Sequence, residues 1–270
     1  MTPASFRAFQ EIAYAQAGIH LREGKAALVQ ARLAKRLREL GLQSEEEYLG
    51  RLRGQAARDE IVLFLDAIST NFTKFFREPD HFELLQDDVA AASAAGQHRF
   101  RFWCAGCASG EEPYTVAMTV HDRLATKDWK ILATDLSTRA LARARAGVYG
   151  DEEIADVPAR YRERFLTRAR GADGSSTWTV SPRLRERIVF RRLNLSQRPY
   201  PMSGPLDAVF CRNVMIYFDR PMRAGLVAEI ERLVKPGGRF FIGHSETLNG
   251  IDTGLLVERP SVYRKRGEAR

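Results

Sequence analysis

From residue 99 onward, short apolar segments typical of strands alternate with amphipathic segments typical of helices. A chain with this alternation folds into βαβ units, which build a mostly parallel sheet with helices on its faces. The segments predicted as strands are 99–106, 130–135, 185–195, 206–213 and 237–245, and those predicted as helices are 111–125, 137–147 and 221–234. The pattern therefore predicts an α/β fold for the larger, C-terminal part of the chain.

The N-terminal part of the sequence shows helical patterns only. In segment 27–40 the leucines recur close to helical spacing, and Gly41 is a plausible stop signal. A cluster of turn residues, GADGSS, interrupts the later alternation and indicates a small β-structured insertion. We therefore predict a helical domain over 1–70, a linker with a lead-in helix over 71–98, and an α/β domain over 99–270 that contains the insertion at 144–187.

The composition is that of a globular protein with an excess of basic residues. There are 42 Lys and Arg against 34 Asp and Glu, a net charge of +8, and the sequence pI is about 9.6. This charge favours an acidic partner: a nucleic acid, an anionic membrane surface or an acidic protein. The sequence contains neither an apolar run of transmembrane length nor a signal-peptide pattern at its start, so we expect a cytoplasmic protein.

The segment 102–112, FWCAGCASGEE, leads from a predicted strand into a predicted helix. Its small residues, Gly106 among them, allow a ligand to approach the backbone closely. Asp135 ends the next predicted strand, where an acidic residue typically accepts hydrogen bonds from ribose hydroxyls. Glu111 and Glu112 at the helix start would repel a pyrophosphate and suit a cationic ligand, so a sulfonium cofactor is the leading candidate. The alternative is an ordinary tight turn between strand and helix.

Cysteine and histidine offer little chemistry in this sequence. Cys104 and Cys107 have C-x-x-C spacing, but no second pair or histidine cluster accompanies them, so we expect buried thiols and no metal. Cys211 ends an apolar strand and is expected in the core. His244 has no nucleophile or acid near it in sequence and is expected to be structural.

Several motifs together resemble the chemotaxis receptor methyltransferase family (CheR type). They are STNFTKFFR at 69–77, SGEEPY at 109–114, ATDLS at 133–137, FCRNVMIYF at 210–218 and KPGGRFFIGHSE at 235–246. The resemblance implies a Rossmann-like S-adenosylmethionine methyltransferase domain with a small inserted β-subdomain, preceded by an all-helical N-terminal domain. It also implies methyl transfer to glutamate side chains of chemoreceptors, which gives glutamate methyl esters and S-adenosylhomocysteine.

The same resemblance implies a set of site residues. Those expected to contact the cofactor are Asn71, Thr73, Arg77, Gly106, Glu111, Glu112, Asp135, Asn194, Leu195, Arg212 and Asn213, and those expected near the methyl transfer are Tyr217 and Arg212. Asp135 would hold the ribose, and Asn194 and Leu195 would flank the adenine.

Some of these positions have simpler explanations, and some depart from the family pattern. Arg77 could pair with Glu78, Asn213 could be a turn residue with positive φ, and Tyr217 could belong to the core. Ala108 and Phe72 stand where polar residues are frequent in the family. A basic residue sometimes credited with a catalytic role is expected near 90–95, where this sequence reads AAASAA.

A basic helix in the N-terminal part is the second functional candidate. Lys25, Arg32 and Arg36 fall nearly on one line at helical spacing. Such a line is either a solvated face or a docking surface for an acidic partner helix. Family resemblance favours docking of the acidic, helical cytoplasmic segments of chemoreceptors, with no nucleic acid bound and with membrane contact only through the receptor.

The expected reaction places few demands on proton transfer. A glutamate carboxylate with a pKa near 4.3 is already ionised at neutral pH, so alignment and exclusion of water would carry the catalysis. Tyr217 would orient the carboxylate, and Arg212 or Arg77 would neutralise charge near it. Two rivals remain open: a nucleic-acid methyltransferase, which the basic charge allows, and a non-catalytic protein that senses the cofactor.

Overall fold

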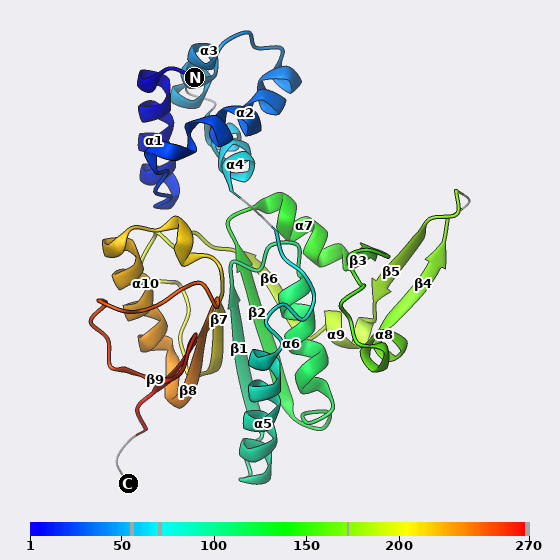
Figure 1. Ribbon diagram of the computed structural model, residues 1–270. Coiled ribbons are helices and arrows are strands. Elements are labelled where there is room, and N and C mark those ends of the chain that lie inside the picture. The colour runs from blue at the N-terminus through cyan, green and yellow to red at the C-terminus, as the bar shows by residue number, and fades with distance from the viewer. Residues whose placement is uncertain (55–56, 70–71, 172, 268–270) are drawn as a thin grey trace.

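The structure is a computed structural model, and it describes residues 1–54, 57–69, 72–171 and 173–267 (Figure 1). The N-terminal region consists of helices α1 (Pro3–Ala17), α2 (Ala26–Leu40), α3 (Glu45–Arg53) and α4 (Ala57–Ile68), with a 3-10 turn at Glu23–Lys25. Phe9, Tyr48 and Phe64 form its aromatic centre, with ring centroids 5.6–6.4 Å apart. Gly41 ends α2 with φ 66°, as the sequence predicts.

A seven-stranded mixed sheet forms the body of the molecule. Its strands are β1 (Arg99–Ala105), β2 (Asp128–Asp135), β6 (Ile188–Arg192), β7 (Leu206–Cys211), β8 (Val234–Ile242), β9 (Leu255–Arg259) and β10 (Val262–Lys265). The order across the sheet is β6-β2-β1-β7-β8-β10-β9, and the first five strands in it are parallel. The predicted α/β fold class is confirmed, and each of the five predicted strands is present.

Helices cover both faces of this sheet because every central strand is apolar on both sides. Helices α5 (Asp80–Ala94), α6 (Glu111–His121) and α7 (Thr138–Ala146) pack on one face, against Phe102 and Phe210. Helix α10 (Arg220–Leu233) packs on the other face, against Trp103 and Phe240. The carboxyl ends of the parallel strands point toward the N-terminal helices (Figure 1).

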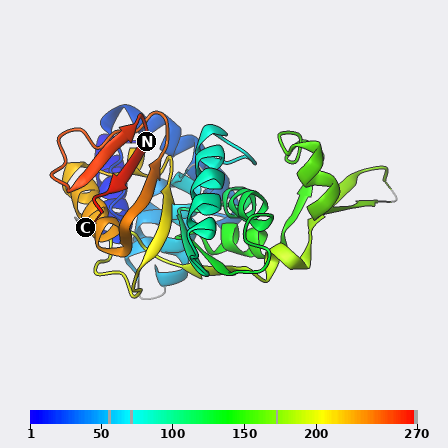
Figure 2. The same ribbon diagram turned by 90° about the horizontal axis from the view of Figure 1, so that it is seen from below.

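A second, small sheet projects to one side of the body (Figures 1 and 2). It has the order β3-β5-β4, from β3 (Val148–Gly150), β4 (Leu166–Arg170) and β5 (Ser176–Val180), with short helices α8 (Ala159–Phe165) and α9 (Pro182–Arg185) beside it. These strands lie in the segment for which the sequence predicts a β insertion. None of the helices in the described ranges is long and apolar enough to cross a membrane.

The antiparallel strands β9 and β10 were not predicted from the sequence. β9 contains one buried residue followed by four exposed ones, so it lacks the alternation that marks a strand with one buried face. It lies at the outer edge of the sheet, where it pairs only with β10. Hydrogen bonding to β10 at the edge of the sheet, and not a local sequence pattern, therefore explains why this segment is a strand.

One buried carboxylate organises the N-terminal helices. Glu60 of α4 is 5% exposed and accepts two hydrogen bonds from Arg36, at 2.8 and 2.7 Å, and one from the hydroxyl of Tyr48 at 2.8 Å. Burial would raise the pKa of Glu60, but the hydrogen bonds from Arg36 and Tyr48 outweigh it and lower the pKa. This network ties α2, α3 and α4 together.

The network corrects one part of the predicted docking line. Arg36 is held by Glu60 and Glu39, so its charge is balanced inside the domain. Arg32 is half-buried and donates to the carbonyl of Ile68 at 2.5 Å. Lys25 is exposed but lies in the 3-10 turn before α2. The three residues therefore do not present one uniform basic face.

We predict that Glu60→Gln destabilises the N-terminal domain by about 1–3 kcal/mol, because it leaves buried hydrogen-bonding groups without a charged partner. Urea unfolding followed by circular dichroism measures the change. Glu39→Gln is the matched control: it removes the other, 47% exposed partner of Arg36 and is expected to cost less than about 0.5 kcal/mol. Equal effects of the two substitutions would contradict the prediction.

Candidate functional site

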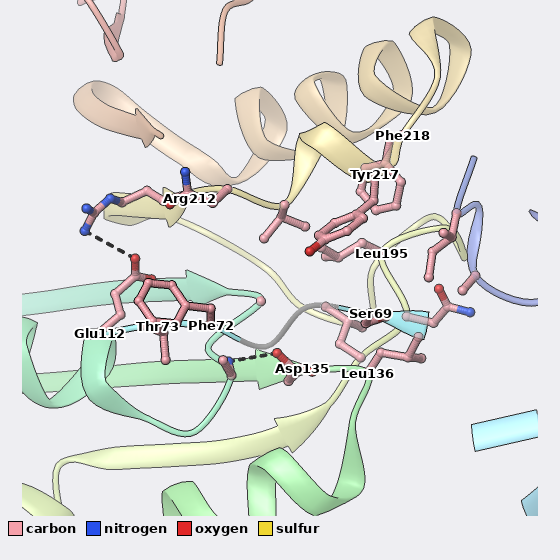
Figure 3. Close-up of a pocket in the computed structure, with 18 of the residues that line it drawn as sticks. Ser69, Phe72, Thr73, Glu112, Asp135, Leu136, Leu195, Arg212, Tyr217 and Phe218 are labelled. Atoms are coloured by element: carbon pink, nitrogen blue, oxygen red, sulfur yellow. Dashed lines mark hydrogen bonds and ion pairs between the residues drawn. The ribbon is translucent and has the colours of Figure 1, made fainter. Parts of the chain in front are cut away.

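The pocket with the predicted site residues lies at the topological switch point of the sheet, where the strand order reverses. β1 has β2 on one side and β7 on the other, and ligands of parallel α/β sheets bind in the crevice at such a point. The cavity is about 940 Å³ when its open mouth is included (Figure 3). Its walls come from the carboxyl-end loops of β1, β2, β6 and β7, from Ser69 and 72–77, and from Ala17 and Ile19 of the N-terminal domain.

The loop after β1 requires glycine at two positions. Gly106 has φ 80°, and a Cβ there would lie 2.4 Å from a methyl carbon of Val214. Gly110 has φ 101°, and a Cβ there would lie 2.8 Å from the Cβ of Ala144. These close approaches pull the loop down onto β7 and α7 and leave Gly106 and Ala108 lining the pocket.

Asp135 closes the floor of the pocket at the end of β2. Its Oδ2 accepts from the backbone N–H of Ala108 at 2.8 Å, and its Oδ1 accepts from that of Ser137 at 2.8 Å. Burial raises the pKa of Asp135, and these hydrogen bonds oppose the rise. The backbone thus fixes the carboxylate while each oxygen keeps a further lone pair that can accept from a ligand hydroxyl.

The structure separates the two glutamates at the start of α6. Glu112 lines the pocket, whereas Glu111 is buried away from it and accepts from the hydroxyl of Ser109 at 2.8 and 2.9 Å. Consecutive helical residues point in directions about 100° apart, so only one of the two can face the ligand. Of these two predicted cofactor contacts, the structure therefore places Glu112 in the pocket lining and Glu111 in support of the loop.

Glu112 carries an unusual charge environment. Burial raises its pKa to about 7, although the nearby charge of Arg212 opposes the rise. Its Oε2 lies 3.4 Å from Nη1 of Arg212, while its Oε1 is buried and has no hydrogen-bond partner among the described residues. A buried carboxylate oxygen without a partner is costly, so this side of the pocket favours a cationic ligand group.

Arg212 lines the pocket, but its guanidinium is buried and bound to neighbouring side chains. Its side chain is 2% exposed, with Nη2 2.9 Å from Oε2 of Glu78 and the guanidinium 5.2 Å from the ring centre of Phe82. It also donates to the carbonyl oxygen of Arg77. Figure 3 shows the side chain extending toward Glu112 and away from Tyr217. Its charge is therefore already balanced by Glu78 and Glu112.

The turn after β7 is held by the half-buried carboxylate of Glu246. Glu246 accepts from the backbone N–H groups of Asn213 at 2.8 Å, Gly243 at 2.7 Å and Ile216 at 3.2 Å. Asn213 has φ 60°, so it is a turn residue with positive φ as well as part of the pocket lining. Sequence reasoning did not identify Glu246, although it lies in the GHSE segment.

Tyr217 occupies the wall between the two domains. It is half-buried, packs against the cores of both domains, and directs its hydroxyl toward the pocket (Figure 3). Its backbone carbonyl accepts from the N–H of His20 at 2.8 Å. Tyr217 is thus partly a core residue, and its polar end still reaches the ligand space.

The loop after β6 forms another contact between the domains. The Nδ2 of Asn194 donates to the carbonyl of Gln16 at 2.7 Å, and its Oδ1 accepts from the N–H and hydroxyl of Ser196. Asn194 and Leu195 line the pocket beside Ala17. The predicted adenine-flanking residues therefore also hold the N-terminal domain against the sheet.

The segment before α5 supplies one side of the pocket. Thr73 and Arg77 line it, and Arg77 Nε lies 4.0 Å from Glu78, a weak version of the ion pair considered from the sequence. Phe72 is 70% exposed at the pocket wall. Asn71, predicted as a cofactor contact, lies outside the described residues.

Other pocket residues were not predicted. They are Ala17, Ile19, Ser69, Lys74, Leu136, Leu193, Val214 and Phe218. Ala17 and Ile19 reach the site only through domain packing, for which no local signal exists. Leu136 and Val214 directly follow predicted residues. Their position after a strand end, where ligands of parallel sheets bind, could have identified them from the sequence. The three cysteines are buried free thiols, and the spacing of Cys104 and Cys107 carries no disulfide.

Comparison with known proteins assigns the family. Residues 71–260 match the family model described as "CheR methyltransferase, SAM binding domain", and residues 4–69 match "CheR methyltransferase, all-alpha domain". The chain is 37% identical to the chemotaxis protein methyltransferase of Escherichia coli over 97% of this chain and 91% of that protein. It is 42% identical to chemotaxis protein methyltransferase 2 of Pseudomonas aeruginosa, over 95% and 90%.

A third relative shows a similar match. The chemotaxis protein methyltransferase of Borreliella burgdorferi is 35% identical over 94% of this chain and 92% of that protein. The predicted resemblance and the predicted cofactor, S-adenosylmethionine, are both confirmed by these matches. The chain therefore belongs to the CheR methyltransferase family.

Proposed function

We propose that the protein transfers the methyl group of S-adenosylmethionine to glutamate side chains of chemoreceptors, as part of chemotactic adaptation. The products are a glutamate methyl ester and S-adenosylhomocysteine. The observation that carries the proposal is a pocket with two half-buried carboxylates, Asp135 and Glu112, at one side and the hydroxyl of Tyr217 at the other. The names of the relatives supply the receptor system: they are chemotaxis methyltransferases.

The residues present fit a cationic nucleoside. The lone pairs left on Asp135 suit ribose hydroxyls, and the unpartnered oxygen of Glu112 suits positive charge on the amino-acid and sulfonium side. Asn194 and Leu195 would flank the adenine. Asn71, Thr73, Arg77, Gly106 and Asn213 complete the proposed cofactor contacts, and Glu111 supports the loop through Ser109.

The proposed chemistry needs alignment more than proton transfer. When bound, S-adenosylmethionine supplies a methyl group on positively charged sulfur. The substrate carboxylate is ionised at neutral pH, so its oxygen forms the new bond to carbon as the bond to sulfur breaks, and no proton moves. Tyr217 orients the carboxylate by a hydrogen bond. Arg212 acts as a positioning residue, because its charge is used to hold Glu78 and Glu112.

The proposed partner is an acidic helical segment of the receptor cytoplasmic region. Lys25 and Arg32 remain docking candidates on the N-terminal domain, and exposed Arg38 of α2 joins them. Arg36 would act indirectly, through its hold on Glu60. Exposed charge pairs of this kind mainly steer association and weaken with salt. A cytoplasmic location is consistent with a substrate on the cytoplasmic side of the receptor.

We predict that Asp135→Ala weakens binding of S-adenosylmethionine by about 1.5–3 kcal/mol, the magnitude of a lost hydrogen bond to a charged group. Isothermal titration calorimetry measures the change. The matched control is Asp128→Ala at the opposite end of the same strand, which should bind as the native protein does. Unchanged affinity in folded Asp135→Ala would remove Asp135 from the cofactor site.

Cofactor affinity should rise with pH because the cation favours the ionised form of Glu112. The pKa of Glu112 is raised to about 7, so its carboxylate is mostly protonated below that value and mostly ionised above it. The dissociation constant should therefore fall about tenfold between about pH 6 and pH 8 and then level off. Glu112→Gln should flatten this dependence. A slope that persists in Glu112→Gln would assign it to another group.

The proposed function is tested by incorporation of labelled methyl groups into receptor cytoplasmic fragments. We expect label on glutamate, released as methanol by mild base, and no label on duplex DNA or RNA. Tyr217→Phe should lower the turnover rate while leaving cofactor affinity nearly unchanged. Label on nucleic acid would support the rival methyltransferase, and cofactor binding without transfer to any receptor fragment would support a non-catalytic sensor.

A further inference from the structure

Two histidines and a glutamate meet behind Arg212, outside the pocket. They are Glu78, in the turn before α5, His81, in the first turn of α5, and His244, just after β8. One ligand atom from each lies within 4.8 Å of the other two. The turn that presents Glu78 is unusual, because Glu78 itself has φ 57°. Such backbone strain in a non-glycine residue often marks a functional position.

The hydrogen bonds of His81 determine which of its ring nitrogens is open. His81 is fully buried, and its Nε2 lies 2.8 Å from the hydroxyl oxygen of Ser261. That hydroxyl donates to the carbonyl of Pro260 at 2.6 Å, so its oxygen accepts from Nε2–H of His81. Nδ1 is then the unprotonated nitrogen. It has no hydrogen-bond partner among the described residues, and it lies 3.7 Å from Oε2 of Glu78.

This arrangement is that of a histidine prepared to bind a metal. Metal-ligating histidines usually donate their second ring N–H to an oxygen, which fixes the ring and directs the other nitrogen at the ion. Ser261 has this supporting position for His81. Without a metal ion, a buried ring nitrogen that lacks a hydrogen-bond partner would lower the stability of the folded protein.

The residues around this cluster include a further carboxylate, and one side of the cluster is open to solvent. The side chain of His244 is 50% exposed, so the cluster is open to solvent on that side, and its Nε2 lies 3.2 Å from Oδ1 of Asp80. Asp80 therefore adds a second carboxylate beside the cluster. Arg212 donates to Oε2 of Glu78, and the backbone N–H of His244 donates to Oε1 of Glu78 at 3.2 Å, so the ion would share this carboxylate with both groups.

We propose that Glu78, His81 and His244 form a binding site for one divalent transition-metal ion of the zinc class. Two imidazoles and one carboxylate are a ligand set that Zn²⁺ accepts, with solvent in the remaining position. An ion placed at the centre of three ligand atoms with this spacing would lie within about 3 Å of each atom. Small side-chain rotations would then bring the atoms to the bonding distance of about 2.0–2.2 Å. The ion would join the turn before α5 to the end of β8. The site shares Glu78 with Arg212, and metal binding to it is measured without cofactor or receptor.

The experiment is titration of the full-length, tag-free protein with Co²⁺, followed by visible absorption, and with Zn²⁺ by calorimetry. We expect one Co²⁺ per chain, with the d–d bands of nitrogen and oxygen ligands, displaced by Zn²⁺. His244→Ala should lower the affinity for both ions by about tenfold or more. Even residues that only support the ligands of metal sites contribute this much to affinity. The matched control is His98→Ala, another exposed histidine, which should bind as the native protein does.

A second variant keeps the test clear of folding effects. His81→Gln removes the buried ligand, and its melting curve shows whether the domain stays folded. In the folded protein, weaker Co²⁺ binding in both His244→Ala and His81→Gln supports the site. Absence of Co²⁺ binding in the native protein, thiolate charge-transfer bands from a cysteine, or equal affinity in His244→Ala and His98→Ala would overturn the proposal.

Discussion

The structure depends on one buried guanidinium, that of Arg212. It stands directly after β7 and reaches the turn before α5 through Glu78 and the start of α6 through Glu112. These segments are far apart in the sequence, and each contributes to the pocket wall. A buried charge without partners costs several kcal/mol. Loss of Glu78 or Glu112 would therefore leave the buried charge of Arg212 without one of its two carboxylate partners. Small displacements of Arg212 would therefore disturb the ligand pocket without any contact to the ligand.

The N-terminal domain contributes residues to the pocket. Ala17 and Ile19 line the pocket, and the backbone of His20 and Gln16 is hydrogen-bonded to Tyr217 and Asn194. Each of these contacts links the helical domain to a loop at the carboxyl end of the sheet. The pocket thus lies between the two domains. This placement allows water to be excluded from the reacting carboxylate.

The sequence predicted the parts of this molecule that local pattern controls. The alternation after residue 99 located the parallel strands, and the glycine loop with Asp135 located the floor of the pocket. It named Glu111 as well as Glu112, although only Glu112 lines the pocket, because the direction of a side chain at a helix start depends on how the helix packs. It also placed Arg36 on an open basic line, although tertiary packing pairs that residue with Glu60. Edge strand β9 and the contribution of Ala17 arise only from pairing and domain contact.

The account is tested most directly by a crystal structure of the protein with bound S-adenosylhomocysteine. It predicts the ribose hydroxyls on Asp135, the adenine beside Asn194 and Leu195, and the sulfur on the side of the pocket that Tyr217 faces. It also predicts a new hydrogen bond to the buried oxygen of Glu112. A nucleoside bound in another groove, such as that lined by Arg58 and Arg192, or a ligand that leaves Asp135 and Glu112 untouched, would contradict it.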